Sequence, residues 1–329
     1  MNDNDQRVVD LFAGGGGLSL GFRNAGFKVV AAYDNWPAAI EFYRKNIREH
    51  PICALDLGAD SAVDVLRSQQ PSMIVGGPPC QDFSSAGKRL ECQRASLTVA
   101  FAKIVAAIKP AIFLMENVER AKNSKAFAEA RNILHEAGYG MTAAVLDACL
   151  CGVPQRRKRL FLFGDLAGKD HQLIPYIIKA QRIKPMTVRD YLGDSLGVEY
   201  YYRHPRSYAR RGVFSIDEPS PTVRGVNRPV PAGYTGHPGD PVPISPKIRP
   251  LTTRERSLIQ TFPPEFDTSG PKSEVEQIIG NAVPVKLAEF VANRIKEYLA
   301  DRDQGKLYGS GSAAVQMSFL FEQKAVYSK

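Results

Sequence analysis

The sequence contains little cysteine, and its cysteines are not arranged as a scaffold. The 329 residues include five cysteines, an odd number at irregular spacing, which argues against a disulfide framework. Cys149 and Cys151 lie close together, but the sequence has no second pair of Cys or His residues to complete a zinc site. We therefore expect neither disulfide bonds nor a bound metal.

Long apolar runs are also missing. No stretch of about 18 apolar residues occurs, so no membrane span is expected. The first residues, MNDNDQR, lack the basic and then apolar pattern of a signal peptide. These two absences predict a cytoplasmic protein. No internal repeats are present.

Positive charge is present in excess and is unevenly distributed. The formal net charge is +9, and residues 165–249 hold 13 Lys/Arg against 8 Asp/Glu, which is +5 of that total. A basic balance favours polyanionic partners, above all nucleic acid. The charge alone is weak evidence, because many basic proteins bind no nucleic acid.

The first half of the chain alternates short apolar runs with helical patterns. This alternation predicts an α/β fold with a doubly wound, mostly parallel sheet and helices on both faces. Ligands of such sheets bind at the carboxyl ends of the strands. The predicted strands are 8–13, 28–34, 53–57, 73–77, 111–117, 141–148 and 159–165, and the predicted helices are about 18–26, 37–49, 60–69, 96–109 and 122–137.

A change in composition predicts a second, smaller domain. Residues 181–277 are rich in proline and arginine and poor in helical periodicity, so we expect a loop-rich domain there. The alternative is an insertion with no binding role. A helix over 284–300 should return to the first domain, which then comprises 1–180 and 278–300, and 301–329 should form a flexible tail.

A glycine-rich loop, DLFAGGGGLSLGF (10–22), follows the first strand. Its glycines fit neither the dinucleotide G-x-G-x-x-G pattern nor the nucleotide-binding loop that ends in Lys. Asp34 ends the second strand, where an acid suits ribose hydroxyls, and Asp56 ends the third. An adenosine site without a pyrophosphate cradle indicates S-adenosylmethionine, while a structural turn or another nucleotide remain alternatives.

Cys80 stands at the carboxyl end of the fourth strand, in IVGGPPCQDFSSAGKR. Pro78 and Pro79 fix the backbone before it, and Gly76 and Gly77 leave no side chain to block access. The pattern indicates a nucleophile whose site must lower the thiol pKa or accept its proton. The alternative is an inert buried cysteine.

Two further segments carry charged side chains at the end or at the start of a predicted strand. Glu116 ends the fifth strand, in MENVE, where it could act as an acid beside the thiol or merely cap a helix. In QRRKRLFLFG (155–164), Arg157 and Arg159 alternate with Arg156 and Lys158, so one pair shares a face. A solvated basic strand start is the alternative interpretation.

Taken together, these segments resemble the DNA cytosine-5 methyltransferases of bacterial restriction–modification systems. The resemblance extends from Val8 to Leu299 apart from the basic middle. DLFAGGGG resembles the cofactor loop, GGPPCQDFS the nucleophile motif, MENV the acid motif and QRRKR the Q-x-R-x-R motif. RPLTTRERSLIQTFP (249–263) and GNAVPVKLAE (280–289) match the last two motifs in order, and PSPTVRG (219–225) resembles the end of a recognition region.

The resemblance implies a Rossmann-like methyltransferase and a set of catalytic roles. Cys80 would attack C6 of a flipped-out cytosine, Glu116 would hold N3 and the exocyclic amine, and Arg159 would contact O2. Arg157, grouped with them, would be structural or directed at a phosphate. C6 is a poor electrophile until N3 gains a proton or a strong hydrogen bond, and the base must leave the stack first.

The resemblance also implies contacts to S-adenosylmethionine. The expected cofactor residues are Phe12, Gly14, Gly16, Asp34, Asn35, Asp56, Leu57, Pro78, Leu97, Asn281 and Val283. Phe12 should lie beside the adenine, Asp34 should bind the ribose hydroxyls and Asp56 the adenine amine. Asn281 and Val283 should fold back beside the glycine loop.

Two regions should contact DNA. The mobile loop of the family would be 84–96, with Cys92 where an acid is often found. The recognition domain should contact phosphates or guanine edges, with steep salt dependence. The expected residues are Ser84, Lys88, Arg89, Arg94, Arg203, Arg206, Arg210, Arg211, Arg224 and Arg228.

The expected partners follow from the same resemblance. They are duplex DNA, a cognate restriction endonuclease acting on the same site and, through QMSFLF (316–321), a bacterial sliding clamp. We expect a monomer of bacterial or phage origin. An RNA cytosine-5 methyltransferase and a catalytically inactive DNA-binding regulator are the rival interpretations.

Overall fold

The computed structural model describes residues 6–79, 88–207 and 209–307, with backbone only for 88–96. Its larger lobe is built on a seven-stranded sheet in the order β3-β2-β1-β4-β5-β8-β6. All neighbouring strands pair in parallel except β8, which is antiparallel to both β5 and β6. The strands are β1 (Arg7–Leu11), β2 (Lys28–Asp34), β3 (Ile52–Ala54), β4 (Met73–Gly76), β5 (Ile112–Val118), β6 (Gly140–Asp147) and β8 (Lys158–Asp165). The predicted mostly parallel sheet is confirmed.

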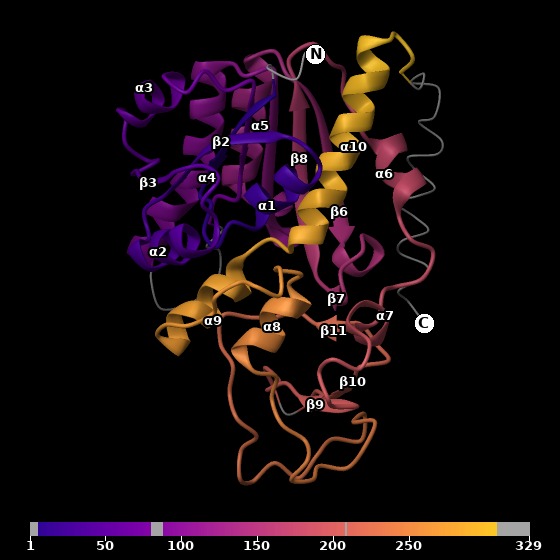
Figure 1. Cartoon of the computed structure of the whole chain (residues 1–329). Coiled ribbons are helices and arrows are strands. Elements are labelled where there is room, and N and C mark those ends of the chain that lie inside the picture. Colours follow the sequence, from indigo (N-terminus) through magenta and orange to yellow (C-terminus); the bar gives the residue numbers. More distant parts are fainter. Residues whose placement is uncertain (1–5, 80–87, 208, 308–329) are drawn as a thin grey trace.

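Helices cover both faces of this sheet (Figure 1). Leu18 and Phe22 of α1 pack with Leu287 and Val291 of α10 in one buried cluster. Phe101 of α4 and the apolar side of α5 belong to a separate cluster. The helices of this lobe are α1 (Gly17–Asn24), α2 (Pro37–Asn46), α3 (Ala62–Arg67), α4 (Lys88–Ile108), α5 (Lys125–Glu136), α6 (Ile174–Ala180) and α10 (Val285–Asp303), with 3-10 turns η2 (Glu119–Asn123) and η3 (Ala148–Leu150).

The close approach of α10 to α1 explains one glycine of the glycine-rich segment. A Cβ at Gly21 would overlap the Ala288 side chain. The last helix therefore completes the first lobe, as the sequence predicts, although it extends to Asp303 rather than ending near residue 300.

The expected mobile loop 84–96 is partly helical. The backbone of Lys88 to Ser96 already belongs to α4, eight residues earlier than the sequence pattern indicates. The segment from 88 to 96 contains no proline or glycine, so nothing in its composition ends a helix there.

The smaller lobe consists of short elements and long connections (Figure 1). It contains the antiparallel pair β9–β10 and the helices α8 and α9. Its core is shared with the first lobe, because Phe42 and Tyr43 of α2 pack with Phe262 and Ile278. The elements are α7 (Val188–Leu192), β9 (Tyr200–Tyr202), β10 (Val213–Ser215), β11 (Ser220–Pro221), α8 (Thr253–Ile259) and α9 (Lys272–Asn281), and β11 pairs with β7 (Gln155–Arg156). Among the described residues, no helix has the length and apolarity needed to cross a membrane.

A buried carboxyl group lies under the glycine loop. Asp10 of β1 is 0% exposed, and its Oδ2 accepts hydrogen bonds from the Ser19 amide (3.1 Å) and hydroxyl (2.6 Å). Tyr43 donates to the Ser19 hydroxyl at 2.7 Å and lies 2.5 Å from His50 Nε2. Burial raises the pKa of Asp10 to about 7.

This carboxyl group should make stability depend on pH. Because its pKa is higher in the folded than in the unfolded state, stability should fall as pH rises from about 4 to 7, and the loss should be complete above pH 7. Asp10→Asn should therefore gain stability relative to wild type between pH 5.5 and pH 8.5 in urea denaturation. The comparison cancels the contribution of His50, whose pKa is lowered by burial. A difference between the two proteins that stays constant with pH would contradict this account.

Candidate active site and nucleic-acid groove

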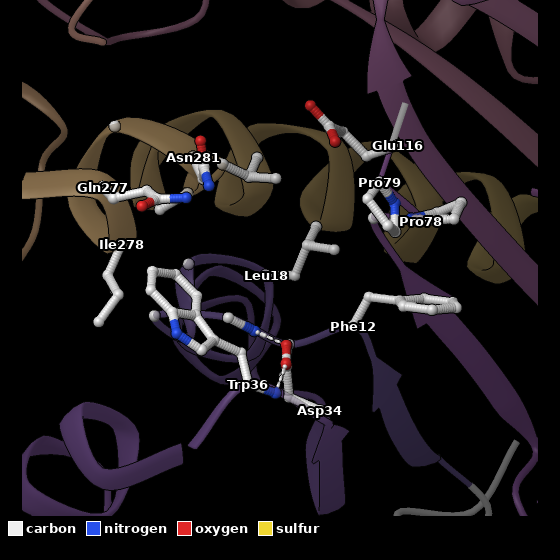
Figure 2. A pocket seen from close by; sticks show the side chains of 18 of the residues that line it. Phe12, Leu18, Asp34, Trp36, Pro78, Pro79, Glu116, Gln277, Ile278 and Asn281 are labelled. Atoms are coloured by element: carbon white, nitrogen blue, oxygen red, sulfur yellow. Dashed lines mark hydrogen bonds between the residues drawn. The ribbon is translucent and has the colours of Figure 1, made fainter. Parts of the chain in front are cut away.

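A cavity of about 760 Å³ opens at the carboxyl ends of β1, β2, β4 and β5. Its wall combines Phe12 after β1, Asp34 at the end of β2, Pro78 after β4 and Glu116 in β5, with residues 277, 278 and 280–283 from α9 and the segment after it. Figure 2 shows Glu116 and Pro79 at one side of the cavity and Trp36, Gln277 and Ile278 at the other. The topology thus brings the first and last motifs of the sequence to one site.

Most of the predicted cofactor and catalytic residues line this cavity. They are Phe12, Gly14, Asp34, Asn35, Pro78, Leu97, Asn281 and Val283, together with Glu116 and Arg159.

Gly16, Asp56 and Leu57 are predicted cofactor residues that are not in the cavity lining. Gly16 is the N-cap residue before α1, with φ +85°, and a Cβ there would overlap Ile47 in the core. Leu57 is 3% exposed within a core cluster. The strand β3 ends at Ala54, so Asp56 lies in the turn that follows rather than at the strand end. Asp56 is exposed there and accepts a hydrogen bond from the Gly58 amide at 2.9 Å.

Gly15 and Gly17, rather than Gly16, are the further loop glycines at the cavity. A Cβ at Gly17 would overlap the carbonyl oxygen of Val283. This glycine is therefore required for the C-terminal motif to lie against the start of α1.

Asp34 organises the glycine loop directly. Its Oδ2 accepts the Gly14 amide and its Oδ1 accepts the Trp36 amide, each at 2.8 Å (Figure 2). A carboxylate can accept about four hydrogen bonds, so each oxygen retains capacity for a ligand hydroxyl.

Trp36 is a cavity residue that the sequence reasoning missed. It is the single tryptophan of the chain and lies half-buried on the cavity wall, with its ring toward the interior in Figure 2. Its place two residues after the strand-end acid Asp34 could have indicated it. A flat aromatic face of this kind can stack on a heterocyclic base.

Glu116 and Arg159 form the polar end of the cavity. Arg159 Nε lies 2.9 Å from Glu116 Oε1, and Glu116 is 8% exposed. Burial raises the pKa of Glu116, while Arg159 and Arg157 oppose that rise. Gly77 leaves room for this carboxylate, since a Cβ there would lie 3.2 Å from Glu116 Oε2.

Gly76 has a different role from the one expected. A Cβ at this position would lie 2.5 Å from the Leu11 carbonyl oxygen and 3.0 Å from Phe101. The glycine thus allows β1 and α4 to pack against β4, rather than opening access to the thiol.

The backbone before Cys80 is held by the acid motif itself. Asn117 Nδ2 donates to the Pro78 carbonyl oxygen at 3.2 Å in a buried contact. Asn117 thereby connects the strand of Glu116 to the segment that leads to Cys80. Cys80, Ser84 and residues 316–321 lie outside the described residues, as do the side chains of Lys88, Arg89 and Arg94.

Arg157 is buried at 1% exposure and does not line the 760 Å³ cavity. Its guanidinium donates to the carbonyl oxygens of Val223 (2.9 Å), Gly280 (2.9 Å) and Ala282 (3.1 Å). These contacts tie β8 to the end of the arginine-rich region and to the C-terminal motif. These contacts fit the structural alternative for Arg157, while its presence in the lining of a hollow between the lobes leaves the phosphate alternative open.

A second hollow, of about 1110 Å³, lies between the lobes and is called here the basic groove. Its wall on the larger lobe includes Arg157 together with Arg120, Arg156 and Lys158, and the sequence analysis predicted no DNA contact for the last three. Five predicted arginines line it, Arg203, Arg206, Arg210, Arg211 and Arg224, whereas Arg228 is not in its lining.

Three of these five arginines are held by the protein. Arg211 pairs with Glu218 and lies 4.4 Å from the centre of the Phe214 ring. Arg203 donates to the Thr222 carbonyl oxygen at 3.1 Å, and Arg224 donates to that of His204.

The chain is similar to known DNA methyltransferases over most of its length. Residues 6–297 match the family model of the C-5 cytosine-specific DNA methylase. The chain is 56% identical to the type II methyltransferase M.HindV of Haemophilus influenzae over 292 residues, covering 88% of this chain and 96% of that protein. It is also 56% identical to M.HgiDI of Herpetosiphon aurantiacus over 295 residues, covering 89% and 95%.

Solved structures share the fold at lower identity. A putative DNA modification methyltransferase of an Escherichia coli prophage superposes with a TM-score of 0.66 at 22% identity, over 89% of this chain and 99% of that one. The Dnmt2 methyltransferase of S. pombe gives 0.66 at 19% identity, over 89% and 99%.

Proposed function

Since the chain belongs to the C-5 cytosine-specific DNA methylase family and is a DNA (cytosine-5)-methyltransferase, we propose that the 760 Å³ cavity binds S-adenosylmethionine and one extruded cytosine. The observation that carries the proposal is the continuity of this cavity. One part is lined by the glycine loop and Asp34, and another by the Glu116–Arg159 pair and the Pro78–Pro79 segment that precedes Cys80.

The Cys80 thiol and the buried Glu116 carboxyl group have different roles in the proposed reaction. The Cys80 thiolate adds to C6 of cytosine and electron density moves to C5, where the methyl group is gained. Loss of the C5 proton then lets the C6–S bond break, which returns the thiolate and the aromatic ring. Addition to C6 becomes feasible when N3 is protonated or strongly hydrogen-bonded.

Glu116 is suited to that interaction with N3. Its burial raises the pKa and thus favours the protonated, hydrogen-bond-donating form, while Arg159 fixes the carboxyl group from the other side. The remaining N–H groups of Arg159 would meet the O2 oxygen of the base. Asn117, through Pro78, positions the backbone before the thiol.

The residues of the cavity fit S-adenosylmethionine. Asp34 has hydrogen-bonding capacity left for ribose hydroxyls, Trp36 and Phe12 offer apolar faces for adenine, and Gly15 and Gly17 leave the loop backbone accessible. When bound, the cofactor supplies an electrophilic methyl group. Asn281 and Val283 close the cavity from the C-terminal motif.

Trp36→Ala should weaken cofactor binding. Loss of one stacked aromatic face costs about 1–3 kcal/mol, which is about 5- to 150-fold in Kd. Isothermal titration with S-adenosylmethionine measures the change, and Trp36→Phe should recover most of the affinity. An unchanged Kd in folded Trp36→Ala would place the adenine elsewhere.

The basic groove is proposed to bind the duplex. Its cations face a gap between the lobes, next to the cavity that would receive the extruded base. We also infer that the protein is located in the cytoplasm of a bacterium, where the DNA is, and that it acts as a monomer. A cognate restriction endonuclease would cut the same site. The contact between residues 316–321 and a sliding clamp remains a prediction.

Bisulfite sequencing of a plasmid from cells that express the protein tests this function. Protected cytosines should occur at one fixed sequence in duplex DNA. Purified protein should methylate mixed duplex DNA in preference to tRNA. Methylation of tRNA alone would support the RNA enzyme instead, and no modified cytosine in either would contradict the proposal.

A further inference from the structure

The basic groove has two walls that are built differently. On the smaller lobe, β9 and β10 form a two-stranded antiparallel ribbon with the register Val213↔Tyr202 and Ser215↔Tyr200. The connection between these strands supplies Arg206 and Arg210 to the groove. On the larger lobe, Arg120 lies in η2 directly after β5, and Arg156 lies in β7 beside the start of β8.

Within the described part of the smaller lobe, most charges at this connection have no carboxylate partner, and Arg211, which pairs with Glu218, is the exception. Arg206 contributes to lowering the pKa of Arg203, to about 10, and that of Arg224, after burial as the main cause in each. Arg203 and Arg224 each donate to a backbone carbonyl oxygen rather than to a carboxylate. The cluster of like charges therefore favours an anionic partner.

Arg206 and Arg210 differ from the other arginines on this wall. Both are exposed, and within the described part of the chain neither side chain makes a hydrogen bond or an ion pair. Arg211, next to Arg210, is paired with Glu218. As far as contacts with the described residues go, Arg206 and Arg210 are therefore the arginines of the smaller lobe that line the groove with their donors available.

The connection between β9 and β10, which carries both arginines, is the part that can reach the DNA major groove, because most residues of the two strands are themselves buried. The commonest specific contact in that groove is an arginine bidentate to O6 and N7 of guanine. The opposite wall belongs to the larger lobe, because η2 follows the strand of Glu116 and β7 leads directly into β8 of the large sheet. Cations held beside the active site are placed for the sugar–phosphate backbone.

Resting on the proposed function of the cavity and groove, we propose that Arg206 and Arg210 read guanine edges of the recognised site, whereas Arg120 and Arg156 bind phosphates only. Sequence selectivity thus depends on one wall of the groove. The other wall supplies affinity without sequence preference and fixes the duplex beside the cavity.

Lysine substitutions test this division, because lysine keeps the charge but cannot make the bidentate contact. The experiment compares binding to the sequence that the protein modifies with binding to sequences in which one base pair is changed. Arg206→Lys and Arg210→Lys should each reduce the ratio of these two affinities by about 10- to 100-fold at one G·C pair. The slope of log K against log salt should stay near that of wild type. Arg120→Ala and Arg156→Ala should weaken binding to all duplexes equally and reduce that slope by about 1 each.

Arg131→Ala is the matched control, since Arg131 is exposed on α5 and does not line the groove. It should change neither quantity. All positions tested are exposed, so melting temperatures should match wild type and exclude misfolding. Full discrimination in both lysine variants, or altered discrimination in Arg120→Ala or Arg156→Ala, would overturn the inference.

Failure of the inference can be told from failure of the proposed function. Binding preference is measured by selection of bound duplexes from a mixed pool, which needs no methyl transfer. A protein that selects one sequence but does not modify cytosine would contradict the proposed function. The guanine contacts of Arg206 and Arg210 could still be tested with that protein. A protein with no preference for any duplex would overturn the inference whatever its activity.

Discussion

Glu116→Gln is expected to lower kcat for methyl transfer by about 10²- to 10⁴-fold, the range contributed by a positioned acid. The amide occupies the same volume and can donate an N–H hydrogen bond to N3, but it has no acidic proton to transfer to N3. Arg159 Nε, 2.9 Å from Glu116 Oε1 in wild type, would keep an acceptor in the amide oxygen. Single-turnover methylation of a duplex with the mapped site measures the effect.

The controls separate chemistry from binding. Affinity for S-adenosylmethionine should remain within a few-fold of wild type, because the glycine loop is held by Asp34 and not by Glu116. A variant that keeps wild-type kcat would remove Glu116 from the mechanism.

Arg157→Met is expected to destabilise the fold rather than only slow the reaction. It would leave the carbonyl oxygens of Val223 and Gly280 without the Arg157 donor, whereas that of Ala282 would keep its second donor, Gln260 Nε2. An unsatisfied buried polar group costs about 1–3 kcal/mol, so the free energy of unfolding should fall by about 3 kcal/mol or more. Urea denaturation measures it.

Arg156→Met is the matched control for that prediction. Arg156 is the neighbouring residue but is exposed, so its replacement should change stability by no more than about 0.5 kcal/mol. Equal stability of the two variants would mean that the carbonyl contacts of Arg157 do not hold the lobes together.

The sequence indicated which strand ends lie together, whereas the roles of their residues in binding and catalysis stay predictions. Apolar periodicity gives the strands, and a parallel sheet gathers their carboxyl ends at one edge, so Phe12, Asp34, Pro78 and Glu116 meet in one cavity. The return of Asn281 and Val283 depended on the family motif, because no local pattern specifies where a last helix packs.

The sequence did not indicate which way a loop residue faces or which distant residue a side chain contacts. Four consecutive glycines look alike in sequence, and the start of α1 at Gly17 decides that Gly16 faces Ile47 while Gly15 and Gly17 reach the cavity. Arg211 is indistinguishable from Arg210 by composition, yet Glu218, seven residues later, pairs with it.

Some groove residues left no local signal at all. Arg120 and Arg156 become part of the basic groove only because the smaller lobe lies opposite them.

Trp36 lines the 760 Å³ cavity and not the groove. It was not predicted because a lone aromatic residue beside a strand end is equally typical of a core position.

The central claim is that Cys80 forms a covalent bond to C6 of the target cytosine, and one trapping experiment tests it most directly. A duplex with 5-fluorocytosine at the mapped position is incubated with the protein and S-adenosylmethionine, then resolved under denaturing conditions. Fluorine at C5 does not leave as the proton does, so the thiolate should remain attached and a protein–DNA band should persist. The band should require the cofactor and be absent in Cys80→Ala. A denaturation-resistant complex in Cys80→Ala, or normal methylation by that variant, would contradict the account.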